Sequence, residues 1–211
     1  MKIKEIYQLY LACNQTICTD TRNIIEGSLF IALKGANFNG NEYAKQALEK
    51  GAKYAIIDEA AYQSEGLYLV KNTLSTLQRL ANHHRKQFDI PFIGITGSNG
   101  KTTTKELIAS VLTQQYNALV TEGNLNNHLG VPFTLLQLRK EHEIAVIEMG
   151  ANKPGDIEEL CNIAEPTHGI ITNIGKAHIE GFGSYEGVIK TKTELYQAIE
   201  QVQGTAVSYT H

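Results

Sequence analysis

The chain of 211 residues has little of what marks secreted, membrane-spanning or nucleic-acid-binding proteins. Its three cysteines (Cys13, Cys18 and Cys161) are odd in number and lack metal-ligand spacing, which favours buried thiols in a reducing cytoplasm over a disulfide framework. No apolar run approaches the roughly 18 residues of a membrane span, and residues 1–11 are too polar for a signal peptide. A net charge of −3 gives no basic field for nucleic acid. A cytoplasmic protein with neither membrane nor nucleic acid as partner is therefore expected.

Repeats and low-complexity tracts are also missing, and the pattern indicates an α/β protein in two parts. Apolar strands alternate with helices on both sides of a break at residues 89–91. This alternation predicts a mostly parallel sheet covered on both faces, with ligands at the carboxyl ends of its strands. We expect a small domain at residues 1–89 and a larger, P-loop-type domain at 90–211. Strands are predicted at 29–33, 54–57, 67–70, 90–95, 118–121, 144–148, 169–173 and in the 204–211 tail, and helices at 41–50, 73–88, 101–115, 132–137, 155–161 and 185–202.

The most informative stretch is residues 94–104, Gly-Ile-Thr-Gly-Ser-Asn-Gly-Lys-Thr-Thr-Thr. A glycine turn between a strand and a helix presents backbone N–H groups and the helix dipole to an anion. Lys101 would reach the outer phosphates of a nucleotide, and the Thr102 hydroxyl would hold Mg²⁺. The loop is shorter than the standard motif, because Ile95 stands where the first glycine should fall. The predicted nucleotide-binding residues are Gly97, Ser98, Asn99, Gly100, Lys101, Thr102 and Thr103.

Two later strands end in side chains that suit a metal ion. Glu148 ends the strand at 144–148, where a P-loop enzyme needs a carboxylate, usually an aspartate. Taken alone, it could be an ordinary exposed acid. His178 lies in the loop after the strand at 169–173. Its spacing leaves a ligand and a structural histidine equally open.

Three other loops contain candidate substrate contacts. The amide-rich loop 122–132 includes Asn126 and Asn127, which could bind substrate or only face solvent. In the first domain, residues 19–22 and 35–40 are also loop-like. Arg22 could bind a phosphate or be a surface charge.

Helical periodicity indicates which side chains face inward. Lys192 lies at the centre of an apolar stripe on the helix at 185–202, where an unpaired ammonium is costly. It could reach solvent, form a buried ion pair, or be a functional lysine that a modification has made non-cationic. Its stripe contains Val188, Ile189, Leu195, Tyr196 and Ile199, with Lys190, Glu194, Gln197 and Gln201 on the other side. In the helix at 101–115, the residues expected to face inward are Leu107, Ile108, Val111 and Leu112.

Together these stretches resemble the Mur ligase family, the ATP-dependent amide-bond synthetases of peptidoglycan assembly. The short phosphate loop is the family's own form. Residues 123–132, 148–157, 181–184 and 190–194 are similar to those of members that add D-alanyl-D-alanine to UDP-N-acetylmuramoyl-tripeptide. The family resemblance rests on residues 20–22, 27–40, 94–103, 148–150, 173–178 and 192.

The resemblance implies a ligase that forms an acyl phosphate from ATP and then an amide, with ADP and phosphate released. Lys101 would stabilise the transferring phosphoryl group. Thr102 and Glu148 would hold one Mg²⁺, and Glu148 with His178 a second. The lysine that matches Lys192 is carbamoylated in the family, and a carbamate can bind metal. Lys101, Lys192 and His178 are thus the expected catalytic residues.

The resemblance also implies where the substrates bind. The UDP part would lie on the N-terminal domain, near Thr21, Arg22, Asn39 and Gly40, although many relatives have aspartate where Asn39 stands. Asn126 and Asn127 are further expected contacts. The family's third domain and the end of its central domain are not in this sequence. We therefore expect a fragment with little ligase turnover alone. We also expect a monomer.

Three other functions fit parts of the pattern. A P-loop phosphotransferase acting on a hydroxyl acceptor would release ADP but no free phosphate, and would not need the N-terminal domain. A ligase similar to folylpolyglutamate synthase would share the central fold, but residues 21–22 and 39–40 argue against it. A nucleotide-binding or partner-binding module with a degenerate site is the non-enzyme alternative. The intact set of Lys101, Thr102, Glu148, His178 and Lys192 argues against a degenerate site.

Overall fold

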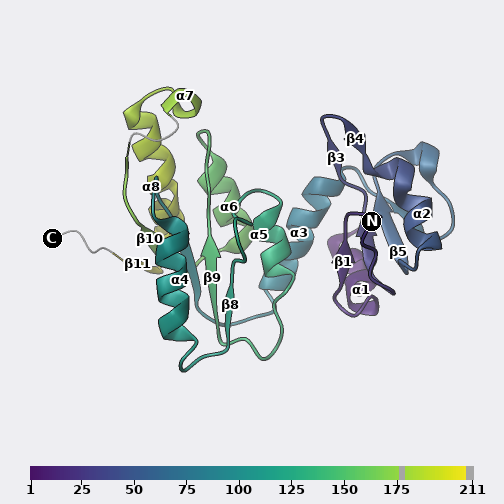
Figure 1. The fold of residues 1–211 in the computed structure, drawn as a ribbon, viewed down its shortest axis with the longest axis horizontal. Helices are drawn as coiled ribbons and strands as arrows, with labels where there is room; N and C mark the ends of the chain where they lie inside the picture. Colours follow the sequence, from purple (N-terminus) through teal and green to yellow (C-terminus); the bar gives the residue numbers. More distant parts are fainter. Residues whose placement is uncertain (176–178, 208–211) are drawn as a thin grey trace. The chain divides into compact units, whose positions relative to one another are not determined.

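The computed structural model describes residues 1–175 and 179–207, which form two compact units, Met1–His83 and His84–His211. The first unit contains a parallel sheet in the order β1-β2-β5-β6 and a two-stranded antiparallel hairpin, β3-β4 (Figure 1). Its strands are β1 (Ile17–Cys18), β2 (Leu29–Ile31), β3 (Lys34–Gly35), β4 (Phe38–Asn39), β5 (Tyr54–Ile57) and β6 (Leu67–Leu69), and its helices are α1 (Ile3–Ala12), η1 (Gly40–Tyr43), α2 (Ala44–Glu49), η2 (Ala60–Tyr62) and most of α3 (Thr73–Arg85).

One hydrophobic cluster of the first unit lies between the sheet and α2 and includes Phe30, Ala55 and Ile57. All three residues of β2 are fully buried, as are Ala55, Ile56 and Ile57 of β5. Alanines on the inner face of α2 let that helix approach the sheet closely. Because β1, β2 and β5 are parallel, the loops that follow them leave the same edge of the sheet.

The second unit is a five-stranded, wholly parallel sheet within the described residues, in the order β11-β10-β7-β9-β8 (Figure 1). The tail strand expected after residue 204 is confirmed, since β11 pairs with β10. The fold class is confirmed as α/β with mostly parallel sheets. The strands are β7 (Phe92–Thr96), β8 (Ala118–Val120), β9 (Ile144–Glu148), β10 (His168–Ile171) and β11 (Thr205–Val207), and the helices are α4 (Lys101–Leu112), α5 (Gly130–Leu135), α6 (Asp156–Ala164), α7 (Ile179–Phe182) and α8 (Tyr185–Gln201).

Helices cover the two faces of this sheet. Ile95, Val146 and Ile170 pack with Ile108 and Leu112 of α4 on one face. On the other face, α8 packs over β10, β11 and β7, and α6 packs against both β7 and α8. Glycines in β7 and β10 let α8 lie close to the strands. Strand alternation therefore separates two apolar layers around one sheet.

The predicted inward face of α4 is partly wrong. Leu107 and Val111 are 64% and 71% exposed, whereas Lys105 and Ala109 are buried. The helical stripe that fits the sheet runs through Lys105, Ile108 and Leu112, with a lysine where an apolar residue would be expected. The face of α4 that packs on the sheet therefore includes the buried side chain of Lys105, and the predicted inward residues Leu107 and Val111 face solvent.

The predicted faces of α8 also need correction. Lys192 is buried, at 3% exposure, as its place in the stripe indicated. Ile189, however, is exposed, and Glu194 is buried. The Glu194 carboxylate accepts hydrogen bonds from the backbone N–H groups of Gly155 (2.9 Å) and Glu158 (3.0 Å) at the start of α6. Glu194 is therefore a helix cap supplied by a neighbouring helix.

The remaining elements were predicted with ends shifted by up to three residues, while α1, β1, the β3-β4 hairpin, η2 and α7 were not predicted. The two compact units divide inside α3, and the domain boundary at residues 89–90 stays a prediction. All three cysteines are free and buried. Among the residues that the structure describes, no helix is long and apolar enough to cross a membrane.

Candidate functional site

The loop between β7 and α4 has the geometry of a phosphate cradle. Gly97 has φ +145°, and a Cβ there would collide with the Thr172 hydroxyl oxygen. Gly100 caps α4 in a left-handed conformation (φ +74°), so the helix begins directly at Lys101. The backbone N–H groups of the first turn of α4 therefore point toward the loop, where an anion would be stabilised.

The loop after β10 braces this cradle. Asn99 donates its backbone N–H to Asn173 Oδ1 (3.1 Å), and its carbonyl oxygen accepts hydrogen bonds from Thr172 Oγ1 (2.6 Å) and Asn173 Nδ2 (2.9 Å). Ser98 Oγ accepts the backbone N–H of Gly175 at 2.9 Å. Two strand ends more than 70 residues apart in sequence thus hold one loop in place.

Lys101 turns back onto its own loop. Its ammonium donates to the carbonyl oxygens of Gly97 (2.9 Å) and Ser98 (3.4 Å). Burial lowers the pKa of Lys101, and the nearby carboxylate of Glu148 opposes that shift. The ammonium is therefore positioned over the cradle by carbonyl groups that a phosphate could replace as partners.

Glu148 is the acidic centre of the site. Its side chain is 1% exposed, and Oε1 accepts hydrogen bonds from Asn126 Nδ2 (2.8 Å) and Thr102 Oγ1 (3.2 Å). Its other oxygen, Oε2, accepts no hydrogen bond among the described residues. A buried carboxylate oxygen without a donor, beside a hydroxyl group, is a suitable environment for a hard divalent cation. The residues present therefore fit Mg²⁺.

Lys105 is a component of this centre that the sequence pattern did not single out. Its side chain is fully buried, and its ammonium lies 3.9 Å from Glu148 Oε2. The signal was available, because Lys105 lies one turn after Lys101 on the inward stripe of α4, as Lys192 lies on the inward stripe of α8.

A cavity of about 310 Å³ opens beside the phosphate loop and brings several predicted residues together. Phe182 contributes an aromatic wall, with its ring 5.5 Å from the Lys192 ammonium. Burial, and then the positive charge of Lys101, lower the pKa of Lys192 to about 8. The lining residues include Gly97, Ser98, Lys101, Asn126, Asn127 and Lys192.

Several predicted site residues do not line this cavity, among them Thr102, Thr103 and Glu148. His178 lies outside the described residues, so its predicted metal contact stays a prediction. Thr103 is exposed in the first turn of α4.

Asn127 uses its side-chain oxygen to accept the backbone N–H groups of Leu129 (3.0 Å) and Gly130 (2.9 Å) at the start of α5.

In the first unit, the two predicted substrate segments are held separately. Asp20 binds the Arg22 guanidinium with both carboxylate oxygens, and this pairing lowers the pKa of Asp20 to about 2. The Thr21 carbonyl oxygen accepts a hydrogen bond from the Lys50 ammonium at 2.8 Å. In the part of the chain that the structure describes, no hydrogen bond links these residues to Asn39 or Gly40.

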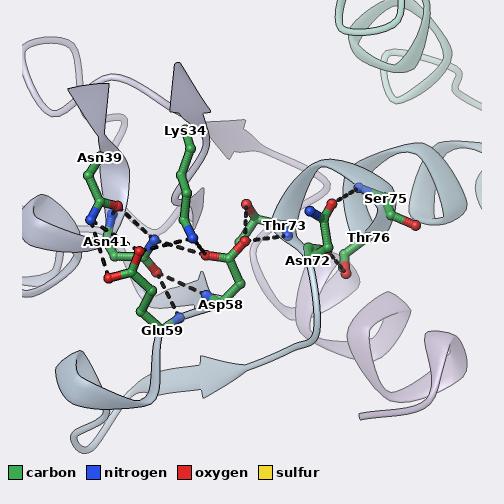
Figure 2. Close-up of polar contacts among 9 residues, drawn as sticks. All are labelled: Lys34, Asn39, Asn41, Asp58, Glu59, Asn72, Thr73, Ser75 and Thr76. Atoms are coloured by element: carbon green, nitrogen blue, oxygen red, sulfur yellow. Dashed lines mark hydrogen bonds and ion pairs between the residues drawn. The ribbon is translucent and has the colours of Figure 1, made fainter. Parts of the chain in front are cut away.

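Asn39 belongs to a polar network that fixes the loop after β2 (Figure 2). The buried Asn41 side chain donates to Asn39 Oδ1 and Asp58 Oδ1, both at 2.9 Å, and accepts the backbone N–H groups of Asp58 (2.9 Å) and Glu59 (3.3 Å). Lys34 bridges Asp58 and Glu59, each at 2.9 Å. The network therefore joins the β3-β4 hairpin and η1 to the two residues that follow β5, Asp58 and Glu59.

This network borders a second cavity. Gly40 donates its N–H to the Leu33 carbonyl oxygen, and a Cβ at Gly40 would collide with that oxygen. The rings of Phe38 and Tyr43 stack 5.3 Å apart, and both line a cavity of about 360 Å³ together with Asn39. A stacked aromatic pair beside amide groups is suited to a planar polar ligand.

The fold and the site define an α/β protein with a P-loop-type phosphate cradle and an acidic strand end beside it. Residues 95–209 match the Mur ligase middle domain, and residues 15–88 match the Mur ligase family catalytic domain. The chain therefore belongs to the Mur ligase family.

Two curated relatives are named UDP-N-acetylmuramoyl-tripeptide–D-alanyl-D-alanine ligase. The protein from a Synechocystis species is 45% identical over 194 residues, which is 90% of this chain and 42% of the relative. The protein from Bacillus subtilis is 40% identical over 188 residues, which is 88% of this chain and 41% of the relative. The chain thus spans about two fifths of the length of these relatives.

Two solved structures have a similar fold. A MurF crystal structure from Acinetobacter baumannii matches with a TM-score of 0.86 and 38% identity, covering 94% of this chain and 47% of that protein. The MurF ligase of Thermotoga maritima, solved in complex with ADP, matches with a TM-score of 0.83 and 36% identity, covering 89% and 44%. Both similarities extend over the two compact units of this chain.

Proposed function

We propose that the full-length protein is an ATP-dependent ligase that joins D-alanyl-D-alanine to UDP-N-acetylmuramoyl-tripeptide, forming ADP and phosphate. The observation that carries this proposal is the cavity that Lys101 and Lys192 line beside the phosphate loop. Curated relatives with this activity in their names, at 35–45% identity, support the choice of substrates.

In the proposed reaction, a carboxylate oxygen of the tripeptide attacks the γ-phosphorus of ATP. The bond between that phosphorus and the bridging oxygen breaks, which gives an acyl phosphate and ADP. The dipeptide amine then attacks the acyl carbon, loses a proton and expels phosphate as the amide forms. Lys101 and the N-terminus of α4 would hold the phosphoryl oxygens and offset their charge, so positioning and electrostatics do most of the work.

Glu148 and Thr102 would hold one Mg²⁺, with His178 beside Glu148 at a second. When bound, Mg²⁺ would neutralise charge on the phosphate oxygens. Lys192 suits carbamoylation, because a lysine with a pKa near 8 is partly neutral at physiological pH. Its neutral amine can add CO₂ with loss of a proton, and the resulting carbamate would supply an anionic oxygen group for binding Mg²⁺. A ¹³C signal from bound ¹³CO₂ that disappears in Lys192→Met would test this step.

The first domain, residues 1–89, would bind the UDP part of the substrate, and residues 90–211 would bind ATP. The aromatic cavity that Asn39 lines is the site we assign to the nucleotide end of that substrate. Thr21 and Arg22, with Asn126 and Asn127 in the second unit, are further proposed contacts. We place the enzyme in the cytoplasm as a monomer.

The test is phosphate release by the full-length protein with ATP, Mg²⁺ and UDP-N-acetylmuramoyl-tripeptide, with and without D-alanyl-D-alanine. Release that needs the dipeptide and is lost in Lys101→Ala is the expected result. ADP formation on a hydroxyl acceptor without free phosphate would mean a phosphotransferase. Nucleotide binding without turnover on any acceptor would mean a binding module.

A further inference from the structure

The Lys105 ammonium is enclosed by groups from three parts of the second unit. It donates to the carbonyl oxygens of Thr121 (2.7 Å) and Gly123 (3.3 Å), after β8, and pairs with the exposed Glu106 carboxylate at 2.9 Å. Its fourth neighbour is Glu148 Oε2 at 3.9 Å. The side chain has no exposed surface, so the charge is fixed in place.

Two lysine ammonium groups therefore lie near Glu148, one bound to carbonyl oxygens after β8 and the other to carbonyl oxygens of the phosphate loop. Lys101 is near enough for Glu148 to influence its pKa, but its ammonium is bound to loop carbonyls that a phosphate would replace. The Lys105 ammonium cannot turn to a bound phosphate in this way, because it is buried and bound to the backbone carbonyl oxygens of Thr121 and Gly123. When Lys101 turns to a phosphate, Lys105 remains the cation beside Glu148.

We propose that Lys105 is an internal counter-ion of Glu148, a positioning residue that stabilises the carboxylate when no metal is bound and weakens its affinity for Mg²⁺. This inference rests on the proposed nucleotide site. Two cations beside one carboxylate repel each other, and a buried carboxylate without a counter-ion is destabilising. The lysine thus keeps the metal exchangeable, so that Mg²⁺ can enter and leave with the nucleotide.

The test uses thermal unfolding of the full-length protein at a fixed ADP concentration, with EDTA or increasing Mg²⁺. Lys105→Met removes the charge at similar length, and Lys105→Arg is the matched control that keeps it. In Lys105→Met we expect a lower Tm in EDTA, a larger Mg²⁺-induced rise in Tm than in the wild type, and a half-saturating Mg²⁺ concentration about tenfold lower. Lys105→Arg should respond as the wild type does.

An equal fall of Tm with and without Mg²⁺ would overturn the inference, because Lys105 would then only anchor the Thr121 and Gly123 carbonyls. If Lys105→Met does not fold, the double variant Glu148→Gln with Lys105→Met decides. Recovery of folding supports a counter-ion, and no recovery contradicts it. If neither Mg²⁺ nor ADP changes the Tm of the wild type, the proposed nucleotide site is refuted, and the counter-ion role with it.

Discussion

The Asn126 side-chain amide donates to Glu148 Oε1 at 2.8 Å, joining a loop to a strand end 22 residues later in sequence. The Asn126 carbonyl oxygen also accepts the backbone N–H of Gly150 at 2.7 Å. This asparagine therefore links the amide-rich loop to both sides of the acidic strand end. The loop is a structural part of the site, beyond any contact that it makes with substrate.

Asn126→Ala should weaken Mg²⁺-dependent ADP binding by about tenfold, because loss of the amide donor leaves Glu148 poorly oriented. Calorimetric titration of the full-length protein with ADP, with and without Mg²⁺, measures this loss. Asn124→Ala is the matched control, since that exposed side chain lies in the same loop. Equal affinities in wild type and Asn126→Ala would show that Asn126 does not support the cation site.

Lys192→Met should stabilise the metal-free, CO₂-free protein at pH 7 by about 2 kcal/mol, because burial penalises the ammonium. The folded pKa is about 8 against an ordinary value of 10.5, so the unfolded chain binds more protons between these values. The free energy of unfolding of the wild type therefore rises with pH between about 8 and 10.5, because Lys192 loses its proton in the folded state first. The difference in free energy of unfolding between Lys192→Met and the wild type should shrink over the same range.

Urea unfolding at pH 7 and pH 10 measures this dependence on Lys192. Lys190→Met provides the control, since Lys190 is exposed on the same helix. A constant difference between wild type and Lys192→Met at both pH values would contradict a buried, titrating ammonium.

Glu194→Ala should lower the free energy of unfolding by about 2 kcal/mol, because two N–H groups at the start of α6 lose a carboxylate acceptor. Glu200→Ala, an exposed position on the same helix, should change it by less than about 0.5 kcal/mol. Urea unfolding compares the two variants. Similar losses in both would argue against a capping role for Glu194.

Asn41→Leu should destabilise the first unit by about 3 kcal/mol, because the backbone N–H groups of Asp58 and Glu59 lose their buried acceptor. Hydrogen exchange at those two amides should accelerate with the loss. Asn37→Leu is the control, since Asn37 is an exposed amide in the nearby turn between β3 and β4. Protected amides in Asn41→Leu would contradict the account of Figure 2.

The sequence predicted the features that depend on local pattern. Alternating strands and helices led to the parallel sheet, and the glycine turn before Lys101 located the phosphate cradle. Helical periodicity also identified Lys192 as buried. These features follow from periodicity and turn chemistry, which short windows of sequence contain.

The missed features depend on partners that are distant in sequence. Lys105 is buried because carbonyl groups after β8 and the Glu148 carboxylate surround it. Glu194 is buried because it caps a different helix. Helical periodicity placed Glu194 on the side away from the apolar stripe of its helix, and predicted that Leu107 and Val111 face inward. Tertiary hydrogen bonds override such assignments.

The most direct test of the proposed ligase follows the oxygen of the tripeptide carboxylate. UDP-N-acetylmuramoyl-tripeptide labelled with ¹⁸O at its reacting carboxylate is incubated with the full-length protein, ATP, Mg²⁺ and D-alanyl-D-alanine. Mass spectrometry of the released phosphate should find one ¹⁸O atom for each amide formed, because the carboxylate oxygen leaves with the phosphoryl group. Phosphate without ¹⁸O would contradict the acyl-phosphate route and, with it, the assigned roles of Lys101 and Glu148.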